Sequence, residues 1–349
     1  MGLENKKIKI LVTGCAGFIG FHLMSKLLNK NYILVGIDNI SDYYSVTLKE
    51  DRLKLLGLNK TTLSNKNTCI NSSLDSNFEF YNSDIQDFEF ISEIFSKYKF
   101  DVVIHLAAQA GVRYSLINPK SYIQTNVNGF FNIIYNSNKN KIQKLIYASS
   151  SSVYGDRSNV PFDETDNVSR PESIYAATKI SNELIAHTYS KLYQLKTIGL
   201  RFFTVYGPWG RPDMAYFSFA NSLFKDEPIC LFNKGKMLRD FTYIDDISES
   251  IIKIIIKEES YKRKEENHSI YNIGNNRPVE LQKFIKVMEK SFNKTFKVKL
   301  LPHQKGDVKS THASNKKFEV DFDYTPSTSL KEGMRSFAKW YKSYYKDEI

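Results

Sequence analysis

The sequence has few cysteines and no long apolar run. Its 349 residues include three cysteines, Cys15, Cys69 and Cys230, which are far apart and in no metal-ligand spacing. We therefore expect a reduced, cytoplasmic protein without a metal centre. Apolar runs such as residues 254–256 are far shorter than the roughly 20 residues that span a bilayer, so no membrane insertion is expected.

Basic residues are in excess but are not concentrated in any stretch. The chain has 49 Lys and Arg against 38 Asp and Glu, a net charge of +11. Without a dense basic run, nucleic-acid binding is not expected, whereas a general positive field suits an anionic small substrate. A hydrophobic content of 42% and this length predict a globular protein with one large domain or two moderate ones.

A glycine-rich turn follows the first apolar run. Residues 8–12 predict a buried strand, and after Thr13 come Gly14, Gly17 and Gly20, followed by apolar residues of helical period. Strand, glycine turn and helix in this order allow the backbone to approach a pyrophosphate at the helix N-terminus. The pattern predicts a dinucleotide-binding turn, to which Phe18 and Ile19 also belong.

The second predicted strand, residues 32–37, ends at Asp38. A carboxylate at this position accepts hydrogen bonds from the adenosine ribose and repels a 2′-phosphate, which favours NAD over NADP. Further strands are expected at residues 78–81 and 102–106, with a polar surface insertion at 59–77. The other residues expected to contact the cofactor, or to orient the backbone that does, are Asn39, Asp84, Ile85, Leu106, Ala107, Ala108, Gln109 and Asn126.

A serine run and a Tyr-x-x-x-Lys pair carry the predicted chemistry. Residues 145–148 predict a buried strand, and the serine run 149–152 follows at its carboxyl end. Tyr175 and Lys179 are four residues apart, so they share one face of a helix. A nearby ammonium favours the phenolate, which makes Tyr175 a possible general base, and a serine hydroxyl can share the substrate proton.

The alternation of strands and helices decays after residue 200. We predict an α/β protein with a Rossmann-like doubly wound parallel sheet in residues 1–200, the domain that carries the catalytic residues. Residues 201–349 are expected to form mainly a smaller substrate-binding lobe, with some segments returning to the first domain. Helices are predicted at residues 245–257, 281–292 and 329–344.

Together these motifs resemble the extended short-chain dehydrogenase/reductase superfamily, over nearly the whole chain. Within it, the sequence is similar to nucleotide-sugar 4-epimerases, and most of all to UDP-glucuronate 4-epimerases. The stretches that carry this closer resemblance are AAQAGVRYS at 107–115, GPWGRPDMA at 207–215, RDFTYIDD at 239–246 and PHQKGDV at 302–308.

The resemblance implies NAD-dependent 4-epimerisation of a UDP-sugar, most closely UDP-glucuronate to UDP-galacturonate, through a 4-keto intermediate. It implies that Ser150, Tyr175 and Lys179 are catalytic, with Tyr175 and Lys179 also at the cofactor. It places Phe203 near nicotinamide, and Arg211 is our leading candidate for the sugar carboxylate. The other residues expected at the substrate are Arg113, Ser149, Ser151, Ser152, Thr204, Arg239 and Asp307.

Other functions remain open on the sequence. A UDP-galactose or UDP-N-acetylhexosamine 4-epimerase fits the same motifs. A dehydratase or UDP-glucuronate decarboxylase is disfavoured because Ser150, Ser151 and Ser152 stand where those enzymes carry a carboxylate, and a non-catalytic NAD-binding protein has no need of an intact Ser/Tyr/Lys set. A homodimer is possible through apolar helix faces, with core burial as the equal alternative, at Phe130, Phe131, Ile133, Ile134, Leu184 and Ile185.

Overall fold

The computed structural model describes residues 7–257, 267–302 and 310–347. Within these ranges, the chain divides into two compact units. The first comprises Met1–Ser149, Ser173–Leu200 and Ser260–Ile270, and the second comprises Ser150–Glu172, Arg201–Glu259 and Tyr271–Ile349. No helix among the described residues is both long enough and apolar enough to cross a bilayer.

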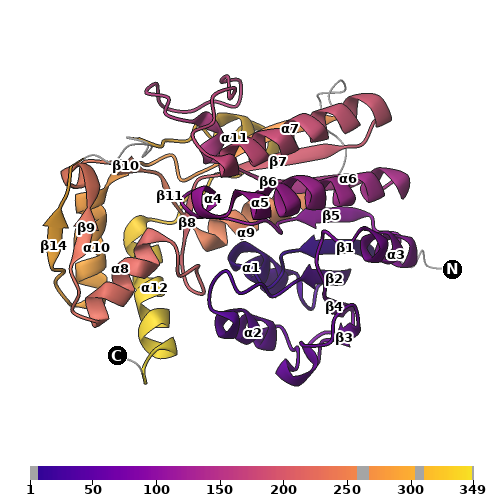
Figure 1. The fold of residues 1–349 in the computed structure, drawn as a ribbon, viewed down its shortest axis with the longest axis horizontal. Helices are drawn as coiled ribbons and strands as arrows, with labels where there is room; N and C mark the ends of the chain where they lie inside the picture. The colour runs from indigo at the N-terminus through magenta and orange to yellow at the C-terminus, as the bar shows by residue number, and fades with distance from the viewer. Residues whose placement is uncertain (1–6, 258–266, 303–309, 348–349) are drawn as a thin grey trace. The chain divides into compact units, whose positions relative to one another are not determined.

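The first unit is built on a large, mostly parallel sheet (Figure 1). The strand order is β12-β7-β6-β5-β1-β2-β4-β3. The strands are β1 Ile8–Thr13, β2 Tyr32–Asp38, β3 Cys69–Asn71, β4 Phe78–Asn82, β5 Val102–His105, β6 Lys144–Ser150, β7 Thr197–Phe202 and β12 His268–Ile273. The division into units falls within β6, β7 and β12, so Ser150 belongs to the second unit while Ser149 belongs to the first.

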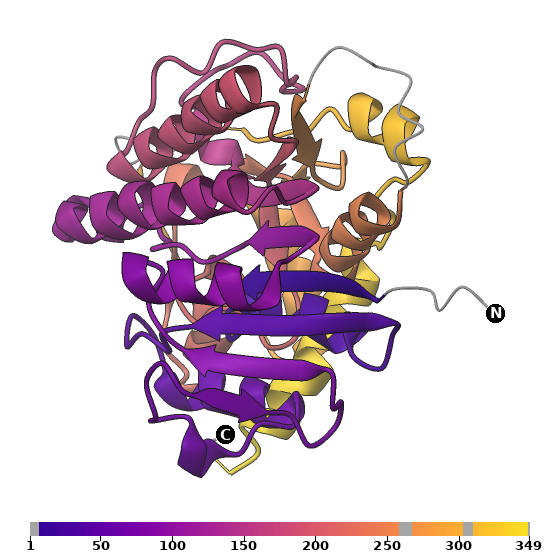
Figure 2. The same ribbon diagram turned by 90° about the vertical axis from the view of Figure 1, so that its right-hand side faces the viewer.

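The central strands are parallel and their loops leave the same edge. β1 pairs with β2 and with β5, β2 pairs with β4, and β5 pairs with β6, all in parallel. The buried run Ile10–Val12 is covered on both faces, as expected for a strand between two helical layers. The Rossmann-like α/β fold predicted from the sequence is confirmed, and Figure 2 shows its indigo and purple strands side by side.

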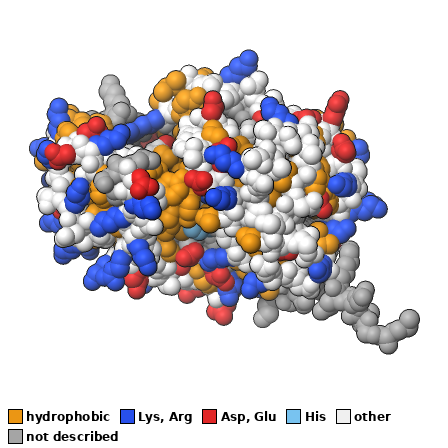
Figure 3. Space-filling view, turned by 90° about the horizontal axis from the view of Figure 1, so that it is seen from below, with side chains coloured by type: hydrophobic (Ala, Val, Ile, Leu, Met, Phe, Trp, Pro, Cys, Tyr) orange, Lys and Arg blue, Asp and Glu red, His pale blue; other side chains and the backbone are white. Residues whose placement is uncertain are grey.

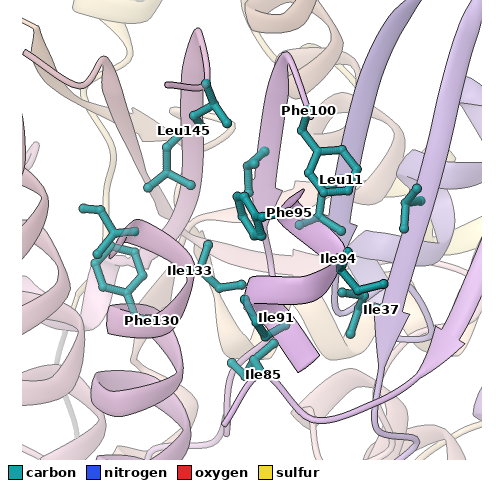
Figure 4. Close-up of a cluster of buried hydrophobic side chains, with 14 of the residues drawn as sticks. Leu11, Ile37, Ile85, Ile91, Ile94, Phe95, Phe100, Phe130, Ile133 and Leu145 are labelled. Atoms are coloured by element: carbon teal, nitrogen blue, oxygen red, sulfur yellow. The ribbon is translucent and has the colours of Figure 1, made fainter. Parts of the chain in front are cut away.

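Helices cover the sheet of the first unit. They are α1 Phe18–Leu27, α2 Val46–Leu55, η1 Lys60–Thr62, α3 Phe88–Tyr98, α4 Tyr114–Ile117, α5 Pro119–Tyr122, η2 Ile123–Gly129, α6 Phe130–Lys139 and α7 Ile174–Tyr193. α3, α6 and α7 pack one face of the sheet, where Phe95, Phe130 and Leu145 belong to one buried cluster (Figure 4). Burial of such side chains stabilises the unit by roughly 1.5–3 kcal/mol each.

Part of the apolar helix face considered for dimerisation belongs to this core. Phe130, Ile133 and Ile134 are completely buried against the sheet, so these three side chains are not available to a partner. Phe131 and Leu184 remain exposed on α6 and α7.

The polar insertion at residues 59–77 is more ordered than the sequence indicated. Its Cys69–Asn71 segment forms β3, which pairs antiparallel with β4 at the edge of the sheet. Asn59 caps the short helix η1 by accepting a hydrogen bond from the Thr61 N–H at 3.1 Å. The sequence did not predict this strand within the surface insertion, because three residues with polar neighbours are too few to show a strand period.

The second unit consists of short elements and an aromatic core. Its elements are η3 Ser151–Tyr154, β8 Thr204–Tyr206, α8 Ala215–Phe224, β9 Ile229–Leu231, η4 Phe232–Gly235, β10 Leu238–Arg239, β11 Phe241–Tyr243, α9 Ile244–Ile256, β13 Val279–Glu280, α10 Leu281–Phe292, β14 Val298–Leu300, α11 Lys316–Phe322 and α12 Leu330–Tyr344. The strand pairs are β8–β11, β9–β14 and β10–β13. In the core, the ring of Phe337 lies 4.9 Å from Tyr216 and 5.9 Å from Phe292. The three helices predicted for this half of the sequence are confirmed as α9, α10 and α12.

Charged side chains are dispersed over the surface. On the face drawn in Figure 3, Lys and Arg are interspersed with Asp and Glu and do not gather into one basic patch. The positive net charge is therefore spread over this face, as the sequence suggested.

Candidate functional site

The glycine turn after β1 has no room for larger side chains. Gly14 has φ +76°, and a Cβ there would lie 2.6 Å from the Ala107 nitrogen. A Cβ on Gly20, in the first turn of α1, would lie 2.1 Å from the Gly14 oxygen. Gly17 precedes α1 directly, so Phe18 and Ile19 place their backbone N–H groups at the helix N-terminus. This cradle fits a pyrophosphate, which needs close backbone approach and N–H donors.

Asp38 is held beside this turn by the backbone. Its Oδ2 accepts a hydrogen bond from Ala16 N–H at 3.0 Å, and its Oδ1 accepts one from Ile40 N–H at 2.9 Å. Asn39 donates to Asp84 Oδ2 at 2.9 Å, so the ends of β2 and β4 are linked. The side chain of Ile85 lies in the hydrophobic core. A carboxylate fixed in this way retains lone pairs for ribose hydroxyls.

Arg52 is a supporting residue that the sequence did not identify. It is fully buried on α2, and its Nη1 donates to the Ala16 oxygen at 2.8 Å and to the Tyr44 hydroxyl at 2.7 Å. Ala16 is thus fixed through its N–H by Asp38 and through its carbonyl by Arg52. Nothing in the sequence around Arg52 indicates a contact with Ala16, 36 residues away.

The loop after β5 is fixed by Asn126 and Thr13. Leu106 N–H donates to the Thr13 carbonyl at 3.1 Å, and Ala107 N–H donates to Thr13 Oγ1 at 3.3 Å. Asn126 is buried, accepts from Gln109 N–H at 2.7 Å and donates to the Gln109 oxygen at 3.0 Å. Asn126 therefore orients the backbone that leads from Ala107 and Ala108 to Gln109, as the sequence suggested.

His105 is a second residue that the sequence analysis missed. Its Nδ1 lies 2.8 Å from Thr13 Oγ1, and the side chain is buried at the end of β5. Burial lowers the pKa of His105 to about 3, and the positive charge of Lys179 acts in the same direction. The imidazole is therefore neutral at physiological pH and supports the glycine turn through Thr13.

Tyr175 and Lys179 share one face of α7, as predicted. Lys179 is buried, its Nζ donates to the Ala148 oxygen at 2.8 Å, and Nζ lies 5.9 Å from the centre of the Tyr175 ring. Burial lowers the pKa of Lys179 to about 8, opposed by the nearby Glu183 carboxylate. Tyr175 is half-buried, so a base of this kind remains accessible to a substrate hydroxyl.

The serine run divides between the two units. Ser149 is buried in the first unit and donates a hydrogen bond to Glu183 on α7, which gives its hydroxyl a structural partner. In the second unit, Ser150 Oγ lies 3.2 Å from Ser152 Oγ and accepts from Ser152 N–H at 3.2 Å. Ser150 thereby caps the short helix η3, in which Ser151 and Ser152 lie.

Tyr154 anchors the end of this short helix. Its hydroxyl donates to Asn272 Oδ1 at 2.6 Å and accepts from Arg201 Nη1 at 2.9 Å. Its ring stacks on Phe162 with centroids 4.6 Å apart. Burial raises the pKa of the Tyr154 phenol despite the neighbouring Arg201, so this tyrosine stays protonated and cannot be the base.

The remaining predicted substrate residues lie on several segments. In the second unit, Phe203 is buried and the Thr204 N–H donates to the Asp240 oxygen at 3.2 Å. Arg211 Nε donates to Asp213 Oδ1 at 3.0 Å, and Arg239 Nη1 donates to the Leu238 oxygen at 2.9 Å. Two further predictions concern other parts of the chain: Arg113 is exposed before α4 in the first unit, and Asp307 lies outside the described residues.

No cluster of three or more His, Cys, Asp or Glu side chains suited to a metal ion occurs in the described parts of the chain.

The fold, the glycine turn and the Tyr175–Lys179 helix define an enzyme of the extended short-chain dehydrogenase/reductase class. Residues 10–274 match the NAD dependent epimerase/dehydratase family, and the chain belongs to that family. The family resemblance and the NAD cofactor expected from the sequence are confirmed.

Relatives of similar length cover nearly the whole chain. Protein CapI of Staphylococcus aureus is 45% identical, over 97% of this chain and 100% of the relative. A probable UDP-glucuronate 4-epimerase of Rhizobium meliloti is 39% identical, over 97% of this chain and 98% of the relative. The crystal structure of UDP-glucuronic acid 4-epimerase from Bacillus cereus, in complex with UDP-glucuronic acid and NAD, is 33% identical and superposes with a TM-score of 0.85, covering 97% and 100% of the two chains.

Proposed function

We propose that this protein interconverts UDP-glucuronate and UDP-galacturonate by NAD-dependent epimerisation at C4. The observation that carries the proposal is that the first unit holds both the Tyr175–Lys179 pair and a glycine turn that fits a pyrophosphate, in a chain similar over 97% of its length to UDP-glucuronate 4-epimerases. Residues 1–200 would supply most of the cofactor site and residues 201–349 most of the sugar site.

The residues of the first unit would bind NAD and move the proton. Gly14, Gly17 and the N–H groups of Phe18 and Ile19 would hold the pyrophosphate, and Asp38 the adenosine ribose. NAD supplies reversible hydride acceptance at C4, so the overall reaction has no net redox change. The Tyr175 phenolate would take the proton of the C4 hydroxyl, and the Lys179 ammonium would favour that phenolate.

The second unit would contribute the serine and the groups that recognise the sugar. Ser150 is proposed to share the substrate proton through Oγ. Ser151 and Ser152 would be hydroxyl donors to the sugar, with Thr204. Arg239 and Asp307 are proposed for the nucleotide diphosphate and its ribose, as the resemblance implies.

The sugar carboxylate raises a specific chemical difficulty. The 4-keto intermediate of UDP-glucuronate is a β-keto acid, which readily loses CO₂. An epimerase must hold the carboxylate so that the breaking bond is poorly aligned with the ketone. It also needs charge-assisted donors, because a buried carboxylate without partners is costly. Arg211, whose guanidinium already binds the Asp213 carboxylate, is the proposed donor, with Arg113 as a second candidate.

The substrate is tested by specificity rather than by rate alone. We expect kcat/KM for UDP-glucuronate to exceed that for UDP-glucose, and Arg211→Ala to lower this ratio at least tenfold, about 1.4 kcal/mol. Arg157→Ala is a matched control, since Arg157 is also an arginine in the second unit that pairs with an aspartate, Asp166, at 2.8 Å. An unchanged ratio in Arg211→Ala would exclude Arg211 as the donor to the sugar carboxylate. A wild type that prefers a neutral UDP-hexose would overturn the assignment of UDP-glucuronate as the substrate.

The base is tested by Tyr175→Phe. This variant should retain NAD and its fold but lose turnover by roughly 10²–10⁴-fold, the usual contribution of general acid–base catalysis. Tyr189→Phe, on the same helix, should turn over normally. Near-normal turnover of Tyr175→Phe would exclude Tyr175 as the general base.

We propose a cytoplasmic location, and a homodimer as one assembly that the exposed part of the α6 and α7 helix face allows. Phe131 and Leu184, with exposed fractions of 43% and 63%, are the available apolar side chains of the face considered above. Leu184→Asp should shift a dimer toward monomer in analytical ultracentrifugation. A wild type that sediments as a monomer at all concentrations would contradict the proposal.

A further inference from the structure

Two tyrosines from separate loops of the first unit pack against each other. The rings of Tyr43 and Tyr114 have centroids 4.9 Å apart and are tilted by 49°. Tyr43 lies in the loop between β2 and α2, and Tyr114 is the first residue of α4, after the loop that leaves β5. Both side chains are half-buried. We refer to this pair as the Tyr43–Tyr114 clasp.

The clasp joins the loops on either side of the glycine turn. β1 lies between β2 and β5 and is parallel to both. The three strands therefore release their loops at the same edge of the sheet, with the glycine turn in the middle. The two loops joined by the clasp therefore flank the glycine turn at this edge.

The loop after β2 is independently anchored. Ile40 N–H donates to Asp38, and Lys49 Nζ donates to Ser41 Oγ at 2.9 Å. The Tyr44 hydroxyl, next to Tyr43 in sequence, accepts from Arg52 at 2.7 Å. Tyr43 is thus presented by a loop whose backbone is already fixed.

The loop after β5 is anchored in a similar way. The buried Tyr122 donates through its hydroxyl to the carbonyl oxygens of Ala110, at 2.7 Å, and Gly111. The Tyr122 ring also lies 6.3 Å from Tyr114 and 6.1 Å, edge-on, from Tyr175. Because each loop is anchored independently, the rings of Tyr43 and Tyr114 can move apart without either loop refolding.

We propose that Tyr43 and Tyr114 are positioning residues that retain the cofactor, by closing across the path along which NAD enters and leaves the glycine turn. An enzyme that removes hydride from a substrate and returns it to the same molecule has no need to release its cofactor in each cycle, so slow release is compatible with turnover. The proposal concerns NAD alone and does not depend on which nucleotide sugar is the substrate.

The test measures the rate at which NAD dissociates from the full-length protein. NAD-loaded protein is mixed with excess alcohol dehydrogenase and ethanol, and NADH formation reports the released cofactor. Tyr43→Leu and Tyr114→Leu should each accelerate release by roughly two- to tenfold, the range that one aromatic pair contributes. The double variant should be no faster than the single variants, because either substitution already opens the clasp.

Matched controls separate the ring contact from other effects. Tyr43→Phe and Tyr114→Phe keep the rings and should release NAD at the wild-type rate. Tyr32→Leu changes a half-buried tyrosine at the opposite end of β2 and should also leave the rate unchanged. Folded leucine variants that release NAD at the wild-type rate would overturn the proposal. A double variant whose release is accelerated by the product of the two single-variant factors would also overturn it. Equal acceleration in Tyr32→Leu would likewise refute it.

A second measurement needs neither NAD nor turnover. Hydrogen exchange of the NAD-free protein in residues 39–45 and residues 106–114 should stay at the wild-type rate when either tyrosine is replaced by leucine, because both loops are anchored without the ring contact. Faster exchange in either loop would show that the loop itself opens, and would refute the ring contact as the cause of faster NAD release.

Discussion

Acidification should destabilise the protein through His105. The folded-state pKa of about 3 is below the ordinary histidine value of 6.5, because the ring is buried beside Thr13 and near the Lys179 charge. Between these two pKa values the unfolded chain binds a proton that the folded chain does not. The stability contributed by the neutral ring is therefore complete above about pH 6.5 and is lost as the pH falls toward 3.

The magnitude follows from the distance between the pH and the unfolded pKa. At about pH 5 the chain is about 1.5 pH units below the unfolded pKa, which corresponds to roughly 2 kcal/mol at 1.36 kcal/mol per unit. His105→Asn removes the titrating ring but keeps a side chain that can hydrogen-bond Thr13. Between about pH 7.5 and pH 5, the wild type should lose about 2 kcal/mol more unfolding free energy than this variant.

Two assays check this prediction. Urea unfolding of wild type and His105→Asn at both pH values gives the difference in stability loss. In addition, NMR titration of the six histidines should show one ring, absent in His105→Asn, that stays neutral at about pH 5. Parallel losses of stability in the two proteins, or a His105 ring that titrates with an ordinary pKa, would refute the reasoning.

Three further predictions concern polar groups of the site. Asp38→Asn should weaken NAD binding about tenfold and reduce discrimination against NADP, measured by calorimetry; a wild type that binds NADP more tightly would contradict the role of the carboxylate. Tyr154→Phe should destabilise the protein by about 1–3 kcal/mol in urea unfolding, because Asn272 and Arg201 lose a buried partner; an unchanged midpoint would contradict this. Lys179→Met should abolish turnover but raise the unfolding free energy by about 1–2 kcal/mol near pH 7. The folded-state pKa of Lys179, about 8, lies below the ordinary 10.5, so the buried ammonium lowers stability below about pH 8 and this cost decreases as the pH rises. A destabilised variant would show that the hydrogen bond to Ala148 outweighs the cost of burial.

Patterns of short range predicted most of the fold. β1, β2 and β5 are continuous apolar runs because both faces of the sheet are covered, and the amphipathic helices α9, α10 and α12 have a clear period. The glycine turn and the Tyr175–Lys179 pair were predictable because their geometry is set within a few residues. β3 was not, since it is a strand only by virtue of pairing with β4.

Residues that support the site through distant contacts could not be predicted. The hydrogen-bond partner is 36 residues away for Arg52, 92 residues away for His105 and 118 residues away for Tyr154. The residues next to each of them in sequence give no sign of these contacts. Ser149 shows the converse. The resemblance singled out Ser150 as the catalytic serine, but only the structure shows that the hydroxyl of Ser149 is buried against Glu183.

The antiparallel strand β3 has a consequence for self-association. It covers β4 through the pairs Cys69–Tyr81, Ile70–Phe80 and Asn71–Glu79, so β4 does not offer an open row of backbone donors and acceptors along that segment. Unpaired strand edges are templates on which chains aggregate, and a strand of only three residues with polar neighbours is a poor template. A chain without residues 59–77 should therefore retain its glycine turn yet form oligomers, since the insertion acts as a barrier to edge-to-edge assembly. The mean molecular mass measured by light scattering should then rise with protein concentration.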